Sequence, residues 1–326
     1  MKAFSLNLKA LVVGAAIMLA AGCGGGSQLG SSQIQPNAAQ ARAHLTLIDR
    51  GAGAHAAPGR SWMALNLTKK DLLYVSSFYS GDTLVFTYPG GKLVGTLNVG
   101  GTVACASASS GDWWVAATDE MLEYAHGGKT PIKTLNGVSG SCAVDPTTGD
   151  LAVINFNGND IIIYPGGSGS GTPYCAGIGR GYFDGYDDRG DLFVDGITSG
   201  QAVSLVELPK GGSACENITL SQKLEFPGGI QWYDKYLAVG DQEAHVIYHF
   251  AIHGTNAKEI GATELGGSSD VVQFYIQKPY VVGADFPNED VDLWDYPAGG
   301  SPVKVFTGPF DDPSGLIVSV GKKQFR

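Results

Sequence analysis

The stretch GSCAVDPTTGDLAVINFNGNDIIIYPGG, residues 140–167, consists of short apolar segments separated by Gly, Pro, Asp and Asn. Its central segment, LAV, ends in valine, and a hydrophobic segment that ends in valine recurs along the chain. The valines are Val75, Val115, Val153, Val194, Val239 and Val282. They lie 40, 38, 41, 45 and 43 residues apart, which is typical of one four-stranded propeller blade per repeat.

A second marker repeats in the same register. Roughly ten residues after each valine, an apolar segment ends in an aromatic residue or leucine and a glycine turn follows. Its copies are VFTYPGG, MLEYAHGG, IIIYPGG, LVELPKGG, YHFAIHG and LWDYPAGG. No segment after residue 60 has a helical period. We therefore predict an all-β fold, a six-bladed β-propeller of four-stranded antiparallel blades over residues 61–326.

The last segment, DPSGLIVSV at residues 312–320, has the pattern of an inner strand, but no valine-marked strand follows it. We expect it to complete the first blade, because joining the two ends of the chain in one sheet removes an exposed edge. The alternative inner strand for that blade is SWMALNL at residues 61–67, in which case the C-terminal strand would be an added one.

Residues 140–167 resemble the NHL repeat of six-bladed propellers from bacteria and animals. In that repeat an inner strand ends in Ala-Val-Asp, and a glycine turn, a strand ending in Val and an Asn follow in order. The matching residues here are Ala143, Val144, Asp145, Gly149, Val153 and Asn159. The arginine that often follows the asparagine is replaced by Asp160. The resemblance covers most of residues 70–320 and implies the same six-bladed fold.

The N-terminus has the features of a bacterial export signal. Lys2 and Lys9 accompany an apolar stretch that is too short for a transmembrane span and ends in LAAGC at Cys23. This ending resembles the lipobox of bacterial lipoproteins, which implies a signal peptide at 1–22 and a lipid on Cys23 that anchors the chain in a bilayer. Residues 23–60 are expected to form a lipidated, flexible tether. By resemblance to bacterial sorting rules, Gly24 favours the outer membrane of the cell envelope.

The charge and the cysteines give two further expectations. The net charge of −10 suits neither nucleic acid nor anionic head groups. Four further cysteines permit two disulfides. Equivalent repeat positions favour Cys105 with Cys142 and Cys175 with Cys215, with free thiols in the inner pair as the alternative.

The stretch FDGYDDRGDLFVDG, residues 183–196, holds five aspartates. Asp187, Asp188 and Asp191 fall in a turn that recurs in other repeats, so turn hydrogen bonding explains them. Other carboxylates are expected near the axis, on the face of the fourth-to-first and second-to-third strand connections. They are Asp184, Asp195, Asp241, Glu243, Asp270 and Asp285. There they could bind a sugar or a cation, calcium or another divalent ion, with Asp184 the best candidate ligand; the alternative is a solvated acidic rim.

The histidines do not indicate a metal site. His245 and His249 share one side of a predicted strand, but residues four apart on a strand are about 13 Å distant, too far to chelate one ion.

Two functions follow from these features. The first is a monomeric, membrane-anchored binding or interaction scaffold that needs no cofactor and whose ligand is a protein, a glycan or a small molecule. The second is a metal-dependent hydrolase, by resemblance to gluconolactonase-type propellers, in which residues at the starts of inner strands hold one cation. The corresponding residues here are Cys105, Cys142, Asp184 and Ile230. Because most of them are not cation ligands, the scaffold is the preferred interpretation.

Overall fold

The computed structural model describes residues 60–77, 80–101, 103–106, 109–155, 159–175 and 179–321. The chain divides into two compact units, Met1–Gln35 and Pro36–Arg326, and every described residue belongs to the second. The predicted signal peptide, Cys23 and the tether up to residue 59 lie outside the described residues. Within the described ranges, no helix has the length and apolar character needed to cross a membrane.

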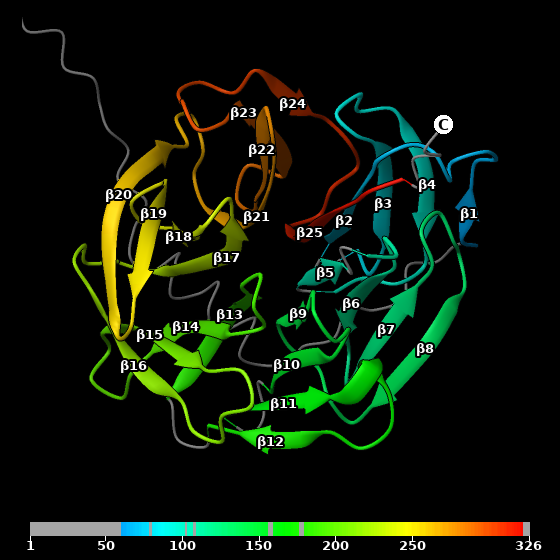
Figure 1. The fold of residues 1–326 in the computed structure, drawn as a ribbon. Coiled ribbons are helices and arrows are strands. Elements are labelled where there is room, and N and C mark those ends of the chain that lie inside the picture. The colour runs from blue at the N-terminus through cyan, green and yellow to red at the C-terminus, as the bar shows by residue number, and fades with distance from the viewer. Residues whose placement is uncertain are drawn as a thin grey trace, which may run out of the picture. The chain divides into compact units, whose positions relative to one another are not determined.

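The described residues form 25 strands in five hydrogen-bonded sheets, with one short 3-10 helix, η1 (Pro165–Gly167) (Figure 1). The first sheet has the order β1 (Trp62–Met63), β4 (Leu93–Leu97), β3 (Thr83–Thr87), β2 (Leu72–Ser77) and β25 (Pro313–Ser319). The second contains β5 (Ala104–Ala106), β6 (Trp113–Ala117), β7 (Glu120–Tyr124) and β8 (Pro131–Asn136). The third contains β9 (Cys142–Val144), β10 (Leu151–Asn155), β11 (Asp160–Tyr164) and β12 (Thr172–Tyr174).

The fourth sheet has eight strands and consists of two antiparallel halves. One half is β13 (Arg180–Tyr186), β14 (Leu192–Ile197), β15 (Val203–Leu208) and β16 (Glu216–Leu220). The other is β17 (Pro227–Tyr233), β18 (Tyr236–Asp241), β19 (Val246–His253) and β20 (Asn256–Glu264). The last sheet contains β21 (Val271–Gln277), β22 (Tyr280–Asp285), β23 (Asp290–Asp295) and β24 (Lys304–Phe306).

The sequence predicts six four-stranded blades, whereas the structure has five hydrogen-bonded sheets, one of them eight-stranded. The outer strands β16 and β20 pair in parallel, with Thr219 opposite Asn256 and Leu220 opposite Ala257. The cause is the long β19–β20 hairpin, whose tip reaches the free edge of β16 and satisfies its unpaired backbone groups. Two additional backbone hydrogen bonds, such as Ser221 N to Ala257 O at 2.9 Å, extend this junction.

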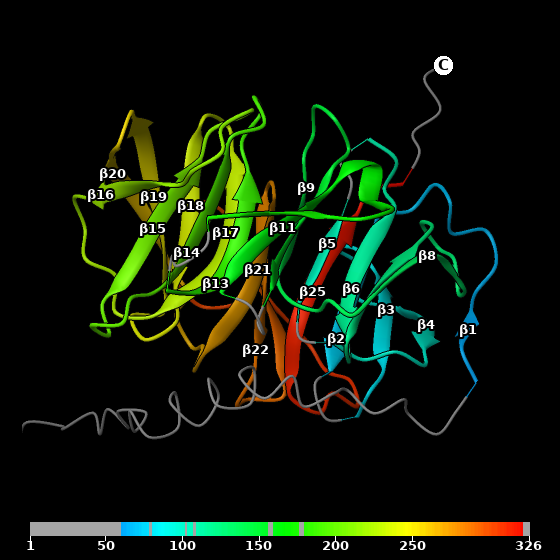
Figure 2. The same ribbon diagram turned by 90° about the horizontal axis from the view of Figure 1, so that it is seen from below.

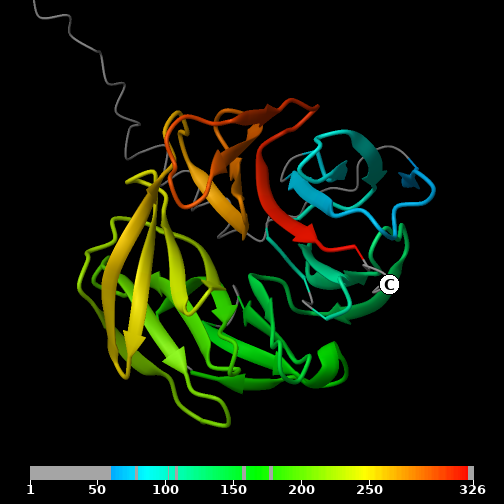
Figure 3. The same ribbon diagram turned by 45° about the horizontal axis from the view of Figure 1, so that its top comes forward.

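The prediction for the C-terminal strand is confirmed. β25 pairs antiparallel with β2, from Leu72 opposite Ser319 to Ser77 opposite Pro313 (Figure 3). The alternative inner strand is wrong, because β1 pairs with β4 and lies at the outer edge of that sheet. The two ends of the described chain therefore meet in one sheet.

The inner strands form a closed ring within this unit. β5, β9, β13, β17, β21 and β25 each contact the next, and β25 lies between β21 and β5 (Figure 2). The hydrophobic core lies between neighbouring sheets. The ring of Tyr74 from the first sheet, for example, stacks on that of Trp113 from the second, with centroids 4.1 Å apart. The marker valines are all buried in this core. This radial arrangement is that of a β-propeller.

Candidate functional site

A cavity of about 330 Å³ lies on the axis of the ring. Its lining includes residues of all the inner strands, among them Cys105, Cys142, Asp184, Gln231, Tyr275 and Ile317. It extends to the turns that follow the inner strands, where Pro146 and Asp188 also line it. The cavity therefore lies at the C-terminal ends of the inner strands.

The other end of the axis is filled by apolar side chains. Val103, Tyr182, Phe183 and Val272 form a buried cluster at the N-terminal ends of the inner strands. The pairing of β13, β17, β21 and β25 is irregular at this end; in β13 the irregularity lies between Gly181 and Asp184, and in β21 between Val271 and Phe274. The extra residues supply Phe183 and Val272 to the cluster. This placement differs from the sequence-based expectation, which put the ligand face at the end that the apolar cluster fills.

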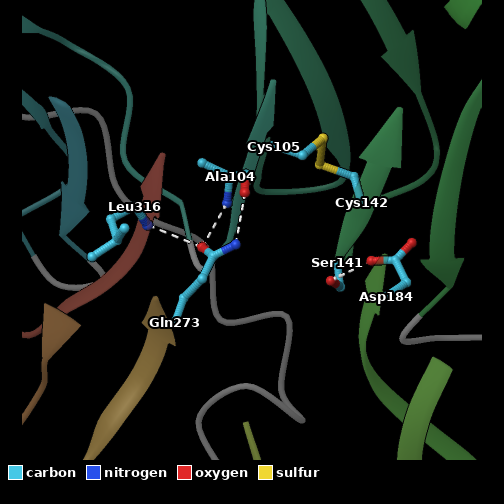
Figure 4. The surroundings of a disulfide bond; sticks show 7 residues. All are labelled: Ala104, Cys105, Ser141, Cys142, Asp184, Gln273 and Leu316. Atoms are coloured by element: carbon cyan, nitrogen blue, oxygen red, sulfur yellow. Dashed lines mark hydrogen bonds between the residues drawn. A yellow bond between two sulfur atoms is a disulfide. The ribbon is translucent and has the colours of Figure 1, made fainter. Parts of the chain in front are cut away.

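Asp184 is a buried carboxylate in the lining of the cavity. Its side chain comes from β13, and Ser141 Oγ donates a hydrogen bond of 2.6 Å to its Oδ1 (Figure 4). Its Oδ2 is also buried and has no hydrogen-bond partner within the part of the chain that the structure describes. Burial raises the pKa of Asp184 to about 7, although the Ser141 hydrogen bond opposes the shift. At neutral pH the group can therefore accept or donate a proton or a hydrogen bond.

Two glutamines connect inner strands around the cavity. Gln231 of β17 accepts a hydrogen bond from Ile276 N at 2.7 Å and donates one to Ile276 O at 3.1 Å. Gln273 of β21 makes the same pair of contacts with Ala104 (Figure 4). Because their amides are occupied by backbone groups, these glutamines hold the lining in place. Sequence reasoning missed both, since neither recurs at its position in the other repeats.

The structure contains the disulfides Cys105–Cys142 and Cys175–Cys215, with Cα atoms 5.8 and 5.3 Å apart. These are the pairs that the repeat positions favour. The first joins β5 to β9 beside the cavity (Figure 4). Its cysteines are therefore unavailable as thiolate ligands.

Three other predicted site residues are buried and accept hydrogen bonds from backbone N–H groups. Asp195 accepts a hydrogen bond from Phe183 N at 2.9 Å. Asp241 accepts from Glu225 N and Phe226 N at 2.7 and 3.1 Å, and Asp285 from Ser269 N and Asp270 N at 2.8 and 3.0 Å. All three carboxylates are buried. Through these hydrogen bonds they fix segments that form or lead into the inner strands.

Glu243 and Asp270 are half-buried. Burial raises the pKa of Asp270 to about 7, and the charges of Asp285 and Glu243 add to the shift. Neither residue lines the axial cavity.

The turn aspartates behave as turn residues. Asp187 accepts hydrogen bonds from the backbone N–H groups of Arg189 and Asp191, and its other oxygen accepts one from Arg189 Nε. Asp191 accepts one from Lys210 N. Asp188 is exposed.

His249 is buried against tyrosine rings. Its Nε2 lies 3.1 Å from Thr263 Oγ1 and 3.0 Å from Tyr296 Oη. Burial lowers its pKa to about 4, so the ring is neutral over most of the physiological range. Among the described residues, no histidine belongs to a group that could hold a metal ion.

The fold places the chain in the class of β-propeller proteins. No model of a known protein family matches the sequence, and no curated protein does either. Two solved structures are similar over most of the chain. One, "Crystal structure of Nidogen/Laminin Complex", has a TM-score of 0.64 at 12% identity and covers 78% of this chain and 100% of its own. The other, a protein of unknown function from Bacteroides caccae, has a TM-score of 0.59 at 12% identity, with coverage of 77% and 99%. At this identity the similarity shows the fold alone.

Proposed function

We propose that this chain is an exported, lipid-anchored scaffold whose β-propeller binds a small polar ligand in the axial cavity. One observation carries the binding proposal: Asp184 lines a cavity of about 330 Å³, and its buried Oδ2 has no hydrogen-bond partner among the described residues. Ligand pockets of proteins start at roughly 300 Å³. A buried polar atom without a partner is costly unless something satisfies it.

The chemistry of the lining suggests the class of ligand. Trp232, Tyr186 and Tyr275 line the cavity together with Asp184. Aromatic side chains offer apolar surface, and the carboxylate suits an N–H or O–H donor. A small molecule with a hydroxyl or amino group on an apolar frame fits this combination.

The repeat supports a six-bladed interpretation of the propeller. Each half of the eight-stranded sheet is an antiparallel series of four strands with its own marker valine, Val194 in β14 and Val239 in β18. Counting the halves as separate blades gives one blade per valine. Under this interpretation the NHL-like stretch forms the blade of β9 to β12.

The lipid anchor rests on the sequence LAAGC at Cys23. Two disulfides are also typical of an oxidising compartment outside the cytoplasm. We expect Cys23→Ser to be exported and recovered in the soluble fraction, while the parent chain sediments with membranes. Membrane attachment of the variant would contradict the anchor.

Ligand binding at Asp184 can be tested with the full-length chain. A library of hydroxylated and amino compounds is screened by the shift in melting temperature, and each hit is repeated on Asp184→Asn and on Asp119→Asn, an exposed turn residue. A ligand of the cavity stabilises the parent and Asp119→Asn but not Asp184→Asn. If every hit stabilises the three proteins equally, the ligand does not bind at Asp184.

The metal-dependent hydrolase is the weaker alternative. A divalent cation at the axis needs several oxygen ligands. Of the carboxylates that line the cavity, Asp187 is bonded to the N–H groups of Arg189 and Asp188 is exposed, which leaves Asp184 as the buried one without such bonds. The amides of Gln231 and Gln273 are bonded to backbone, and Cys105 and Cys142 form a disulfide. These residues do not fit an axial cation.

A protein partner is the second candidate for the scaffold, because one structural neighbour is described as a nidogen/laminin complex. In that case the screen yields no ligand that depends on Asp184.

A further inference from the structure

The β22–β23 hairpin brings three carboxylates together, away from the axial cavity. Asp285 ends β22, and Asp290 and Asp292 lie on β23. One carboxylate oxygen of each lies within 4.8 Å of the other two. Asp290 is directly opposite Asp285 in the strand pair, and like charges in this position destabilise a sheet. Asp290 and Asp292 are two residues apart and point to the same side of the strand.

Asp292 departs from the pattern of the repeat. In each repeat the marker valine pairs with a residue of the next strand, and Asp292 comes one residue before that partner, Leu293. The residues at the same position in the other repeats are Thr83, Met121, Ile161, Leu205 and Ile247. All of these are buried, and four are large apolar residues. Asp292 is also buried, with 3% of its surface exposed. Asp292 therefore places a carboxylate at a position that lies in the core in the other repeats.

Nothing in the described part of the protein neutralises this carboxylate. Asp292 Oδ1 and Asp290 Oδ1 are buried and have no hydrogen-bond partner. The ion pairs of Lys133 with Glu123 and of Arg189 with Asp187 and Asp191 do not include Asp292. A buried carboxylate without a partner is costly unless a cation compensates it.

Asp285 is held in place by its surroundings. Its oxygens accept hydrogen bonds from Ser269 N, Asp270 N and Asn288 Nδ2, the last at 2.9 Å. Ser269 Oγ in turn donates to Asn288 Oδ1 at 3.0 Å. Such outer hydrogen bonds orient the ligands of protein metal sites.

The geometry points to a calcium site formed by Asp285, Asp290 and Asp292. Ca²⁺ binds oxygen ligands at about 2.3–2.6 Å, so two ligands of one ion lie no more than about 5 Å apart. The separation of at most 4.8 Å meets this condition. The half-buried Asp290 leaves one side open to water, which completes the coordination of six to eight oxygens that Ca²⁺ takes. Mg²⁺ is the less suitable ion, because it requires near-ideal octahedral geometry and gives up its water reluctantly.

The test measures calcium binding by the full-length chain. Binding is measured by equilibrium dialysis with Ca²⁺ and with Mg²⁺ at concentrations up to roughly millimolar, a range that includes the dissociation constants of extracellular calcium modules. Melting temperatures are then recorded with Ca²⁺ and with a chelator. We expect one Ca²⁺ per chain and a higher melting temperature in its presence. Asp290→Asn/Asp292→Asn should lose Ca²⁺ affinity by roughly 100-fold or more, since losing even an outer hydrogen-bond partner costs 10–100-fold.

Melting temperatures measured in the presence of chelator show whether a variant has lost only the calcium site or has also lost stability of the fold. Without Ca²⁺, the Asn double variant should melt at or above the temperature of the parent, because the like charges have been removed. Asp234→Asn, at an exposed residue of the β17–β18 turn, should bind Ca²⁺ like the parent. The proposal is overturned if the parent binds no Ca²⁺ in this range or if the double variant binds it as tightly as the parent.

Discussion

The side chain of Gln273 and the backbone of Ala104 are joined by two hydrogen bonds, from Ala104 N at 3.1 Å and to Ala104 O at 2.7 Å. The same Oε1 atom accepts a third hydrogen bond from Leu316 N at 2.9 Å. β21, β5 and β25 belong to three different sheets. One amide therefore supplies hydrogen bonds that no sheet ladder provides between these inner strands.

Gln273→Leu should destabilise the protein by about 3 kcal/mol, because it leaves buried backbone groups of Ala104 and Leu316 without partners. Urea unfolding measures the loss. The control is Gln222→Leu, whose amide bonds near the surface to Lys223 O and Tyr248 Oη and whose replacement should cost about 0.5 kcal/mol or less. Equal losses for the two variants would show that the central glutamine has no special role.

Gly315 in β25 lies where the chain ends meet. A Cβ atom there would overlap Ser76 Oγ and come within 3.0 Å of the backbone of Val103. Gly315→Ala should therefore destabilise the protein by about 2 kcal/mol through overpacking. In the matched variant Gly200→Ala, the nearest atom to the new Cβ is Thr198 Oγ1 at 3.7 Å, so thermal unfolding should be nearly unchanged. A parent-like melting temperature for Gly315→Ala would contradict the tight closure.

The two disulfides offer a matched pair of deletions. Their cysteines are separated by 37 and 40 residues, so loop entropy alone predicts a similar loss of about 3–4 kcal/mol for each. Cys105 and Cys142 are buried whereas Cys175 and Cys215 are half-buried. We therefore expect Cys105→Ala/Cys142→Ala to cost more than Cys175→Ala/Cys215→Ala in urea unfolding, because it also loses core packing. A larger loss for the outer pair would refute this ranking.

The carboxyl of Asp184 should make stability depend on pH. Its folded pKa of about 7 lies above the ordinary value of about 3.9, so between these values the folded state binds more protons than the unfolded state. The contribution of Asp184 to the free energy of unfolding is therefore fully present below about pH 4 and is lost as the pH rises to about 7. The full change is on the order of 4 kcal/mol, since each pKa unit corresponds to about 1.4 kcal/mol.

Asp184→Asn isolates this effect from other titrating groups, such as His249, whose lowered pKa works in the opposite direction. The difference in unfolding free energy between parent and variant, measured from pH 5 to pH 8, should move steadily in favour of the variant as the pH rises. A difference that stays constant would mean that the carboxyl titrates at its ordinary pKa in the folded protein.

Much of the fold could be predicted from the repeat. The marker valines are buried in second strands, and β25 completes the first sheet as predicted. These features depend on alternation and turn residues, which are local properties of each repeat. The parallel pairing of β16 with β20 could not be predicted in this way, because it depends on where the β19–β20 hairpin tip lies in space.

The site was less predictable. The sequence alone identified Asp184 as a carboxylate that the repeat does not require. Only the tertiary structure placed it in a cavity beside Ser141 and put the apolar cluster of Phe183 and Val272 at the opposite end. The physical reason is that axial contacts join residues as far apart as the 169 positions between Ala104 and Gln273, whereas sequence periodicity reports only which side of a strand each residue occupies.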